Sequence, residues 1–242
     1  MVTLASLNKI TFALQRCYRV IPSQFPPIHL FEDVASPEEY DALFAIQMLT
    51  NPRIQEEIGL LDLVPKEQRL YAVPGCGYVM AAFTHINPNG SRFSNGDYGI
   101  YYAAESLNTA IAETVYHKEL FLSFTNEPPQ ELAMRSLVAE FSADLFDLTP
   151  LDKKNSPVYS PVDYSQSQLL GTQIKEQQEA GLIYHSVRSE GTNYALFKPN
   201  TIHKCQQGVH LSYVWDGEKI ATVYQKIIKK ESSNNMLEHD VN

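Results

Sequence analysis

Residues 90–113 combine the side-chain types that are needed to bind a phosphorylated sugar. Gly90-Ser91-Arg92-Phe93-Ser94 is predicted to form a turn, a short aromatic strand follows at 99–104, and a helix then carries Glu113. Such a turn offers backbone N–H groups, and a guanidinium binds phosphate oxygens through two parallel hydrogen bonds. The strand supplies an aromatic face, and the carboxylate supplies one hydrogen-bond acceptor. This order of residues therefore predicts a site for a phosphorylated sugar.

Three charged residues are candidates for this chemistry, and each also has a simpler structural interpretation. Glu113 lies on the flank of the apolar stripe of its helix, so it either reaches a cleft at the edge of the core or is solvated at the surface. Arg92 is either a phosphate clamp or the arginine of an exposed turn. Arg19 lies in the apolar run Tyr18-Arg19-Val20, where a charged residue usually faces solvent. The residues alone leave these alternatives open.

Tyrosine and serine residues extend the predicted site. Tyr101 and Tyr102 are neighbours on a strand, so one is expected in the core and the other toward a ligand. Ser165 is predicted to cap a helix N-terminus, where free N–H groups also favour an anion. Ser186 follows His185 on a strand, and because strand neighbours face opposite ways, they do not form a catalytic pair. The chain has no G-x-S-x-G motif, which further disfavours serine-hydrolase chemistry.

Composition excludes several classes of function. The chain has 242 residues and a net charge of −9, and its lysines and arginines are scattered, which disfavours sequence-independent nucleic-acid binding. Its seven histidines lack metal-binding spacing and its three cysteines lie far apart, so neither a metal site nor a disulfide framework is expected. No secretory signal and no apolar stretch of about 20 residues is visible. We therefore expect a cytoplasmic protein that contacts neither membranes nor nucleic acid directly.

The pattern along the chain predicts a mixed α+β protein with a largely antiparallel sheet. Helices are expected at 1–15, from 36 onward, at 51–61, 106–117 and 165–180, with Gly181 just after the last. Strands are expected at 17–21, 70–73, 78–83, 99–104, 137–148, 182–187 and 193–197, with a final hairpin of 209–213 and 220–227. Neither a regular β-α-β alternation nor a G-x-G-x-x-G motif is present, which argues against a Rossmann sheet. The polar residues 231–242 are expected to form a disordered tail.

Taken in order, these motifs resemble the RES-domain family, which is named for an arginine, a glutamate and a serine. Tyr18-Arg19 is similar to the family's N-terminal YR, and Gly90-Ser91-Arg92-Phe93-Ser94 is similar to its GGRWN. Residues 100–113 are similar to its xYLA strand and to the helix that ends in glutamate. Residues 163–171 resemble D-W-S-x-x-Q-x-x-G, and residues 181–188 resemble the late strand G-x-x-Y-x-S-x-R.

The resemblance covers about residues 16–197. We interpret the whole chain, 1–242, as a single RES-like domain with its core at about 16–230. About 70 residues separate Arg19 from the GGRWN-like turn, a gap that is short in the family. Residues 26–86 are therefore interpreted as an insertion that forms a lid or a partner surface.

Individual positions also differ from the family pattern or match it twice. Phe93-Ser94 replaces Trp-Asn at the turn. Alignment back from the glutamate places the family tyrosine at Tyr102. Two serines match the family serine, and the spacing together with the following Gln168 favours Ser165 over Ser186.

The resemblance implies an ADP-ribosyltransferase-like fold and the degradation of NAD+. Cleavage of the nicotinamide–ribose bond would proceed by phosphorolysis, which yields nicotinamide and ADP-ribose 1″-phosphate, or by hydrolysis. NAD+ is then the substrate, inorganic phosphate is a co-substrate, and no cofactor is needed. The implied catalytic residues are Arg19, Glu113 and Ser165. The implied substrate-binding residues are Ser91, Arg92, Phe93, Tyr102, Gln168 and Ser186.

The resemblance also implies a protein partner, because family members are the toxins of bacterial toxin–antitoxin pairs. The antitoxin would carry a helix-turn-helix DNA-binding domain, and its C-terminal segment would cover the active site. A homodimer is compatible with this organisation. Two other classes of function stay open, a mono-ADP-ribosyltransferase that modifies a macromolecule and a non-catalytic NAD-binding interaction module. Product analysis identifies the first, and binding without turnover identifies the second.

Overall fold

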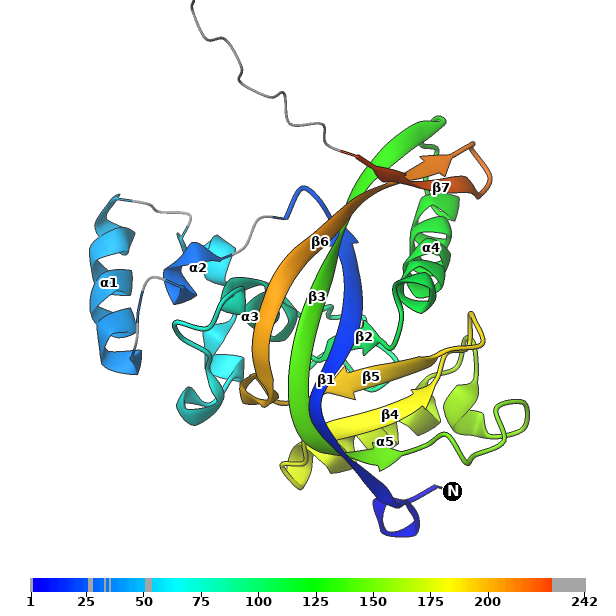
Figure 1. Cartoon of the computed structure of the whole chain (residues 1–242), viewed down its shortest axis with the longest axis horizontal. Coiled ribbons are helices and arrows are strands. Elements are labelled where there is room, and N and C mark those ends of the chain that lie inside the picture. The colour runs from blue at the N-terminus through cyan, green and yellow to red at the C-terminus, as the bar shows by residue number, and fades with distance from the viewer. Residues whose placement is uncertain (1, 26–27, 33, 35, 51–53, 228–242) are drawn as a thin grey trace, which may run out of the picture.

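The computed structural model describes residues 2–25, 28–32, 34, 36–50 and 54–227 of the chain. The strands are β1 (Lys9–Pro22), β2 (Tyr101–Ala104), β3 (Gln130–Asp147), β4 (Gly181–His185), β5 (Thr192–Leu196), β6 (Ile202–Trp215) and β7 (Ile220–Lys226). They form one seven-stranded sheet with the order β1-β2-β5-β4-β3-β6-β7 (Figure 1). Every neighbouring pair is antiparallel except β3 and β4. The expected α+β class with a mostly antiparallel sheet is thereby confirmed.

The sheet bends back on itself because β1 also pairs with β3. Strand β3 continues on its other edge into β6 and β7. At the opposite edge, β1 meets β2 at a single pair of residues, Tyr18 opposite Ala104. The strands β1, β2, β5, β4 and β3 therefore form a closed circuit that is joined most narrowly beside Arg19.

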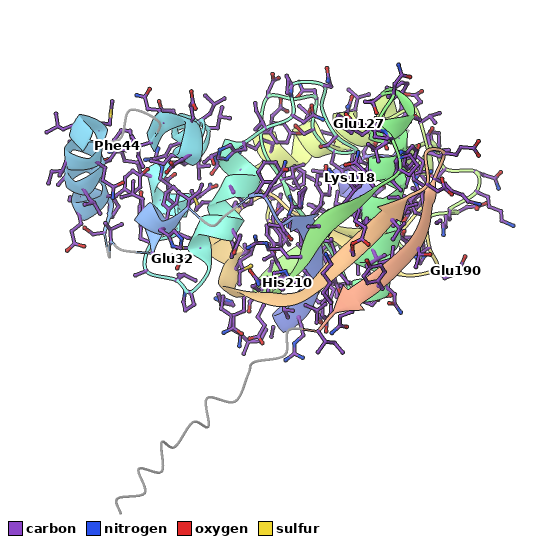
Figure 2. All side chains as sticks on the ribbon, turned by 90° about the horizontal axis from the view of Figure 1, so that it is seen from above. Glu32, Phe44, Lys118, Glu127, Glu190 and His210 are labelled. Atoms are coloured by element: carbon purple, nitrogen blue, oxygen red, sulfur yellow. The ribbon has the colours of Figure 1, made fainter. Side chains whose placement is uncertain are left out.

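The α-helices of the described residues are α1 (Pro37–Thr50), α2 (Ile54–Ile58), α3 (Cys76–Thr84), α4 (Leu107–Ser123) and α5 (Ser165–Glu176). Figure 1 shows α1, α2 and α3 on one side of the long strands β1, β3 and β6, and α4 on the other. In the view from above, α1 with Phe44 lies at the opposite end of the molecule from Glu190 (Figure 2).

Helix α4 begins where the sequence predicts it. The Ser106 hydroxyl accepts a hydrogen bond from the backbone N–H of Thr109 at 3.1 Å, which satisfies one of the free donors at the helix N-terminus. The helix packs against β1 and β2. Its second turn therefore places Glu113 beside the narrow join between these strands.

Residues 28–84 contribute to the main hydrophobic core. Phe31, Val79 and Met80 from this segment are buried in one cluster with Tyr101 and Leu137 of the sheet. Helix α3 packs against β6 and β2. The role as a lid or partner surface that we assign to residues 26–86 stays a prediction.

The expected helix over residues 1–15 is wrong, because β1 already begins at Lys9. A register shift between Phe12 and Gln15, with a left-handed φ of 50° at Leu14, marks a bulge in this strand. A bulge inserts an extra residue and breaks the strict alternation of side chains. The apolar residues are therefore spread in a pattern that looks helical.

The strands expected at 70–73 and 78–83 are also wrong, because α3 occupies the second run and the first forms no strand. Val79, Met80 and Phe83 of this helix are all buried. A buried helix produces a continuous apolar run that periodicity cannot distinguish from a buried strand. A Cβ at Gly77 would lie 2.4 Å from the carbonyl oxygen of Ile28, so the close packing of α3 also requires glycine here.

The remaining elements follow the predictions more closely. β2, β4 and β5 lie within the expected runs or within one residue of them, and β6 and β7 flank the predicted turn. Helix α5 ends at Glu176, and Gly181 begins β4 with a φ of +146° instead of ending the helix. The residue at the N-cap of α5 is Tyr164, without a side-chain cap, so the expected capping role of Ser165 is wrong. The predicted tail, 231–242, lies outside the described residues.

Candidate active site

A cleft of about 430 Å³ opens where β1, β2, α4, β4 and β5 meet. The turn that precedes β2 and the residue before α5 complete its wall. The residues that line it are Tyr18, Arg19, Val20, Asn87, Asn89, Gly90, Ser91, Arg92, Tyr102, Ala103, Ala104, Ala110, Glu113, Thr114, His117, Leu120, Tyr164, Tyr184 and Asn193. Five residues expected at the site are thus brought together: Arg19, Ser91, Arg92, Tyr102 and Glu113.

Glu113 is half-buried in the cleft wall and is oriented through one of its two carboxylate oxygens. The hydroxyl of Ser186 donates to Oε1 at 2.6 Å, and the side-chain amide of Asn193 donates to the same oxygen at 2.7 Å. Among the described residues, none forms a hydrogen bond with Oε2. The carboxylate is therefore positioned by the protein and keeps one oxygen available to a ligand.

Ser186 is the serine that contacts the glutamate. It is completely buried, and its oxygen accepts hydrogen bonds from the backbone N–H groups of Arg188 and Ser189, both at 3.0 Å. With its oxygen engaged in this way, the hydroxyl proton points to Glu113. The neighbouring His185 contacts the carbonyl oxygen of Thr149, away from this group, as expected for strand neighbours.

Ser165, which the spacing favours as the family serine, lies elsewhere. It is exposed at the first turn of α5, and its backbone N–H donates to the Asp163 carboxylate at 2.9 Å. It does not line the cleft. The structure thus brings Ser186, and not Ser165, to Glu113.

Asn193 is a site residue that the sequence analysis missed. It lies on β5 opposite Ala104 of β2 and Tyr184 of β4, and only 3% of its surface is exposed. A buried amide must find hydrogen-bond partners, and here one partner is Glu113. The signal in the sequence was a single amide at the start of the apolar strand run 193–197.

Arg92 is buried, with 8% of its surface exposed. Its Nη1 donates to the carbonyl oxygens of Val158 at 3.1 Å and Ser160 at 3.0 Å. Its guanidinium lies 4.6 Å from the ring centroid of Tyr164. The interpretation of Arg92 as an arginine of an exposed turn is therefore wrong.

Arg19 is half-buried, and its Nη1 donates to the carbonyl oxygen of Tyr102 at 2.8 Å. Its guanidinium also lies 5.1 Å from the ring centroid of Tyr101. Within the described part of the chain, neither Arg19 nor Arg92 forms an ion pair. The cleft lining thus contains two guanidinium groups that form no ion pair with a described residue, and such groups favour an anionic ligand.

Tyr102 and Gln168 hold the turn that carries Arg92. The Tyr102 hydroxyl contacts the Ser91 hydroxyl at 2.8 Å and accepts from the backbone N–H of Phe93 at 3.0 Å. The Gln168 amide donates to the carbonyl oxygens of Ser91 at 3.0 Å and Ser94 at 3.2 Å. Burial raises the pKa of Tyr102, so its hydroxyl stays protonated. Both residues thus act on the shape of the turn.

The turn itself differs from the expectation in two respects. The N–H groups of Gly90, Ser91 and Phe93 are all bonded within the protein, so they are not offered to a ligand as expected. The Phe93 ring is fully buried and packs edge-on against Tyr184 with centroids 5.0 Å apart. Phe93 does not line the cleft.

Tyr184 and His117, which the sequence analysis also missed, complete the surroundings of Glu113. Burial, and then the Glu113 charge, raise the pKa of Tyr184 well above its usual range. Desolvation lowers the pKa of His117, and the Glu113 charge acts in the opposite direction. Both side chains are therefore uncharged at neutral pH. Glu113 is the one carboxylic acid among the described residues that line the cleft.

Among the residues that the structure describes, no group of three histidine, cysteine, aspartate or glutamate side chains is placed to hold a metal ion. In the same part of the chain, no helix combines the length and apolar character needed to cross a bilayer.

Two known proteins are similar to this chain over most of its length. The uncharacterized protein y4oC of Sinorhizobium fredii (strain NBRC 101917 / NGR234) is 33% identical over 212 residues, which is 86% of each chain. One chain of the crystal structure of the M. tuberculosis MbcT–MbcA toxin–antitoxin complex aligns over 84% of this chain and 86% of its own length. Its sequence identity is 12% and its TM-score is 0.41.

The RES domain family model matches residues 69–216, more than half of the chain. The match includes Arg92, Glu113, Ser165 and Ser186, whereas Arg19 precedes it. The motifs read from the sequence agree with this assignment. Arginine and glutamate side chains line the cleft, and the buried Ser186 donates to Glu113. The chain belongs to the RES domain family.

Proposed function

We propose that this protein degrades NAD+ by cleaving the bond between nicotinamide and ribose. The observation that carries the proposal is the state of Glu113, which is held through Oε1 by Ser186 and Asn193. Its second oxygen is available in a cleft that also contains two uncompensated guanidinium groups. This combination suits a substrate with a cationic sugar centre and a pyrophosphate.

The reaction needs little acid catalysis. Nicotinamide leaves as a neutral molecule with the electron pair of the C–N bond, so no proton has to be supplied to it. The sugar passes through a state similar to an oxocarbenium ion, and the Glu113 carboxylate stabilises its positive charge. An oxygen of inorganic phosphate then bonds to the ribose carbon and gives ADP-ribose 1″-phosphate. If water attacks instead, the products are ADP-ribose and a proton.

The two arginines have different parts in this proposal. Arg19 is half-buried and is the better placed to contact the pyrophosphate or the attacking phosphate directly. Arg92 donates to two backbone carbonyls and contributes its positive charge from within the wall. Tyr102 and Gln168 hold the turn that carries Arg92 through hydrogen bonds to its backbone.

Product analysis of NAD+ turnover tests this function. Phosphorus and proton NMR would follow NAD+ with the wild-type protein, with and without phosphate. A phosphate-dependent sugar phosphate indicates phosphorolysis, and ADP-ribose in both conditions indicates hydrolysis. Transfer of ADP-ribose to an added macromolecule would instead identify a transferase. NAD+ that stays intact with the folded wild-type protein would contradict the proposal.

A matched pair of variants ties the activity to the site. We expect Glu113→Gln to lower kcat by about 100- to 1000-fold, because it removes a preorganised charge that is aligned with the transition state. Glu218→Gln, at an exposed position of the β6–β7 turn, is the control. Equal activity of the two variants would exclude Glu113 from the chemistry.

We further propose that the protein is the toxin of a toxin–antitoxin pair, on the basis of its family. Induced expression of the wild-type chain should lower cellular NAD+ and stop growth, and Glu113→Gln should not. Co-expression of a cognate antitoxin with a helix-turn-helix domain should restore growth. Continued growth with depleted NAD+ would contradict the toxin role and leave the enzymatic proposal intact.

A further inference from the structure

Residues 158–164, which we call the strap, comprise the end of the 3-10 helix Pro157–Tyr159 and the loop that follows it. Two arginine side chains hold the strap beside the cleft. Arg92 donates to the carbonyl oxygens of Val158 and Ser160, and Arg188 donates to that of Pro161 at 2.7 Å. Arg188 is itself stacked on the α4 residue Tyr116, with its guanidinium 3.3 Å from the ring centroid. Both ends of the strap therefore rest on elements that also carry the site.

The strap ends at Tyr164, the residue before α5. Its carbonyl oxygen accepts from the backbone N–H of Gln168 at 2.8 Å and from the Ser167 hydroxyl at 3.0 Å. Gln168 in turn holds the turn that carries Arg92 through two hydrogen bonds. The backbone of Tyr164 is thus fixed relative to both the cleft and Arg92.

The Tyr164 ring contacts the Arg92 guanidinium and belongs to the cleft lining. It lies 4.6 Å from the Arg92 guanidinium, within the range of a cation–π contact. The side chain is half-buried and lines the cleft. Among the described residues, no other aromatic ring packs on the Tyr164 ring. The contact with Arg92 restrains the ring, so a ligand that packs on it causes little further loss of side-chain entropy.

We propose that Tyr164 is a stacking platform for a planar heteroaromatic ring of the ligand, and that it determines specificity for ligands that carry such a ring. The inference rests on the proposed function for the identity of the ligand. NAD+ contains two rings of this chemistry, adenine and nicotinamide, and both can stack on a tyrosine. The experiments below separate the two sources.

A direct binding measurement uses Tyr164→Trp. The natural chain has one tryptophan, Trp215, which is 2% exposed and does not line the cleft, so it serves as an internal control in the wild-type protein. Titration with ADP-ribose should quench the new tryptophan if adenine stacks there, and titration with nicotinamide should quench it if nicotinamide does. Binding of ADP-ribose and nicotinamide by calorimetry, with no quenching by either, would overturn the proposal. This readout does not require turnover, so it survives failure of the proposed reaction.

Kinetics supply the second test. Loss of the aromatic side chain on which one base stacks weakens binding by about 5- to 150-fold. Tyr164→Leu should therefore raise the KM for NAD+ by a factor in this range, with little change in kcat. Tyr164→Phe should restore the wild-type KM, because the ring and not the hydroxyl is needed. Tyr224→Leu, at an exposed tyrosine of β7, is the matched control. A wild-type KM in a folded Tyr164→Leu protein would overturn the platform role.

Discussion

Asn193 provides the sharpest test of how the site is built. Its amide donates to Glu113 Oε1 at 2.7 Å from a position that is 3% exposed. A hydrogen bond to a charged group contributes about 1.5–3 kcal/mol. If this bond acts in the transition state, Asn193→Ala should lower kcat by about 10- to 150-fold. KM should change little, because Asn193 orients the carboxylate and does not bind the phosphates.

Asn193→Asp makes the prediction more specific. It replaces the donor with a second carboxylate about 2.7 Å from Glu113. Two carboxylates at this distance do not both ionise readily, so the pair binds a proton with a raised apparent pKa. The fully ionised pair then forms only at higher pH. Below that pKa the shared proton lets the substituted carboxyl still donate to Glu113, and above it the donor is lost and two negative charges repel. Activity should therefore be retained at lower pH and fall as the pH rises through this pKa, whereas the activity of Asn193→Ala should stay low.

The assay is steady-state NAD+ consumption across a pH series, with kcat and KM determined separately. Asn155→Ala, at an exposed amide in the loop before the 3-10 helix, is the control for an asparagine substitution. Circular dichroism would establish that each variant is folded. A wild-type kcat in folded Asn193→Ala would refute the idea that this amide positions Glu113.

Three further predictions concern Ser186, Arg19 and Gly171. Ser186→Ala should lower kcat and also reduce the free energy of unfolding by about 1–3 kcal/mol, because two half-buried N–H groups lose their acceptor. Urea unfolding and NAD+ turnover would be measured for this variant and for Ser165→Ala. Equal losses of kcat and stability in the two variants would contradict the placement of Ser186 at the site. Arg19→Ala should reduce kcat/KM by about 10- to 150-fold and weaken its dependence on salt, and an unchanged salt dependence would exclude contact with phosphate. Gly171→Ala places a Cβ 1.9 Å from the Phe93 carbonyl oxygen, so urea unfolding should show a loss of about 1–3 kcal/mol, which a wild-type midpoint would disprove.

The elements that the sequence predicted well are those specified by nearby residues. Ser106 caps α4 through a contact three residues away, and Asp216 in the turn between β6 and β7 accepts hydrogen bonds from the N–H groups of Glu218 and Lys219. Alternation along β2 likewise separated Tyr101 in the core from Tyr102 at the cleft. Such signals act over a few residues and need no tertiary contact.

The elements that were predicted wrongly depend on distant partners. The expected strand at 17–21 lies within β1, but the first half of β1 was interpreted as a helix because its bulge disturbs the alternation of its side chains. This half is held as a strand by pairing with β3 more than 100 residues later. α3 was interpreted as a strand because it is buried by the sheet and by residues near Ile28. In both cases packing between remote segments overrides the local pattern.

The candidate site divides in the same way. The sequence by itself determined the family, the turn with Arg92, and a helix that carries Glu113 at a fixed place. Only the tertiary structure decided which serine meets that glutamate, because Ser186 and Asn193 lie 73 and 80 residues further along the chain. These contacts arise when α4 packs beside β2 and β5 pairs between β2 and β4. Residue spacing carries no information on which strand faces the carboxylate, and it therefore favoured Ser165 over Ser186.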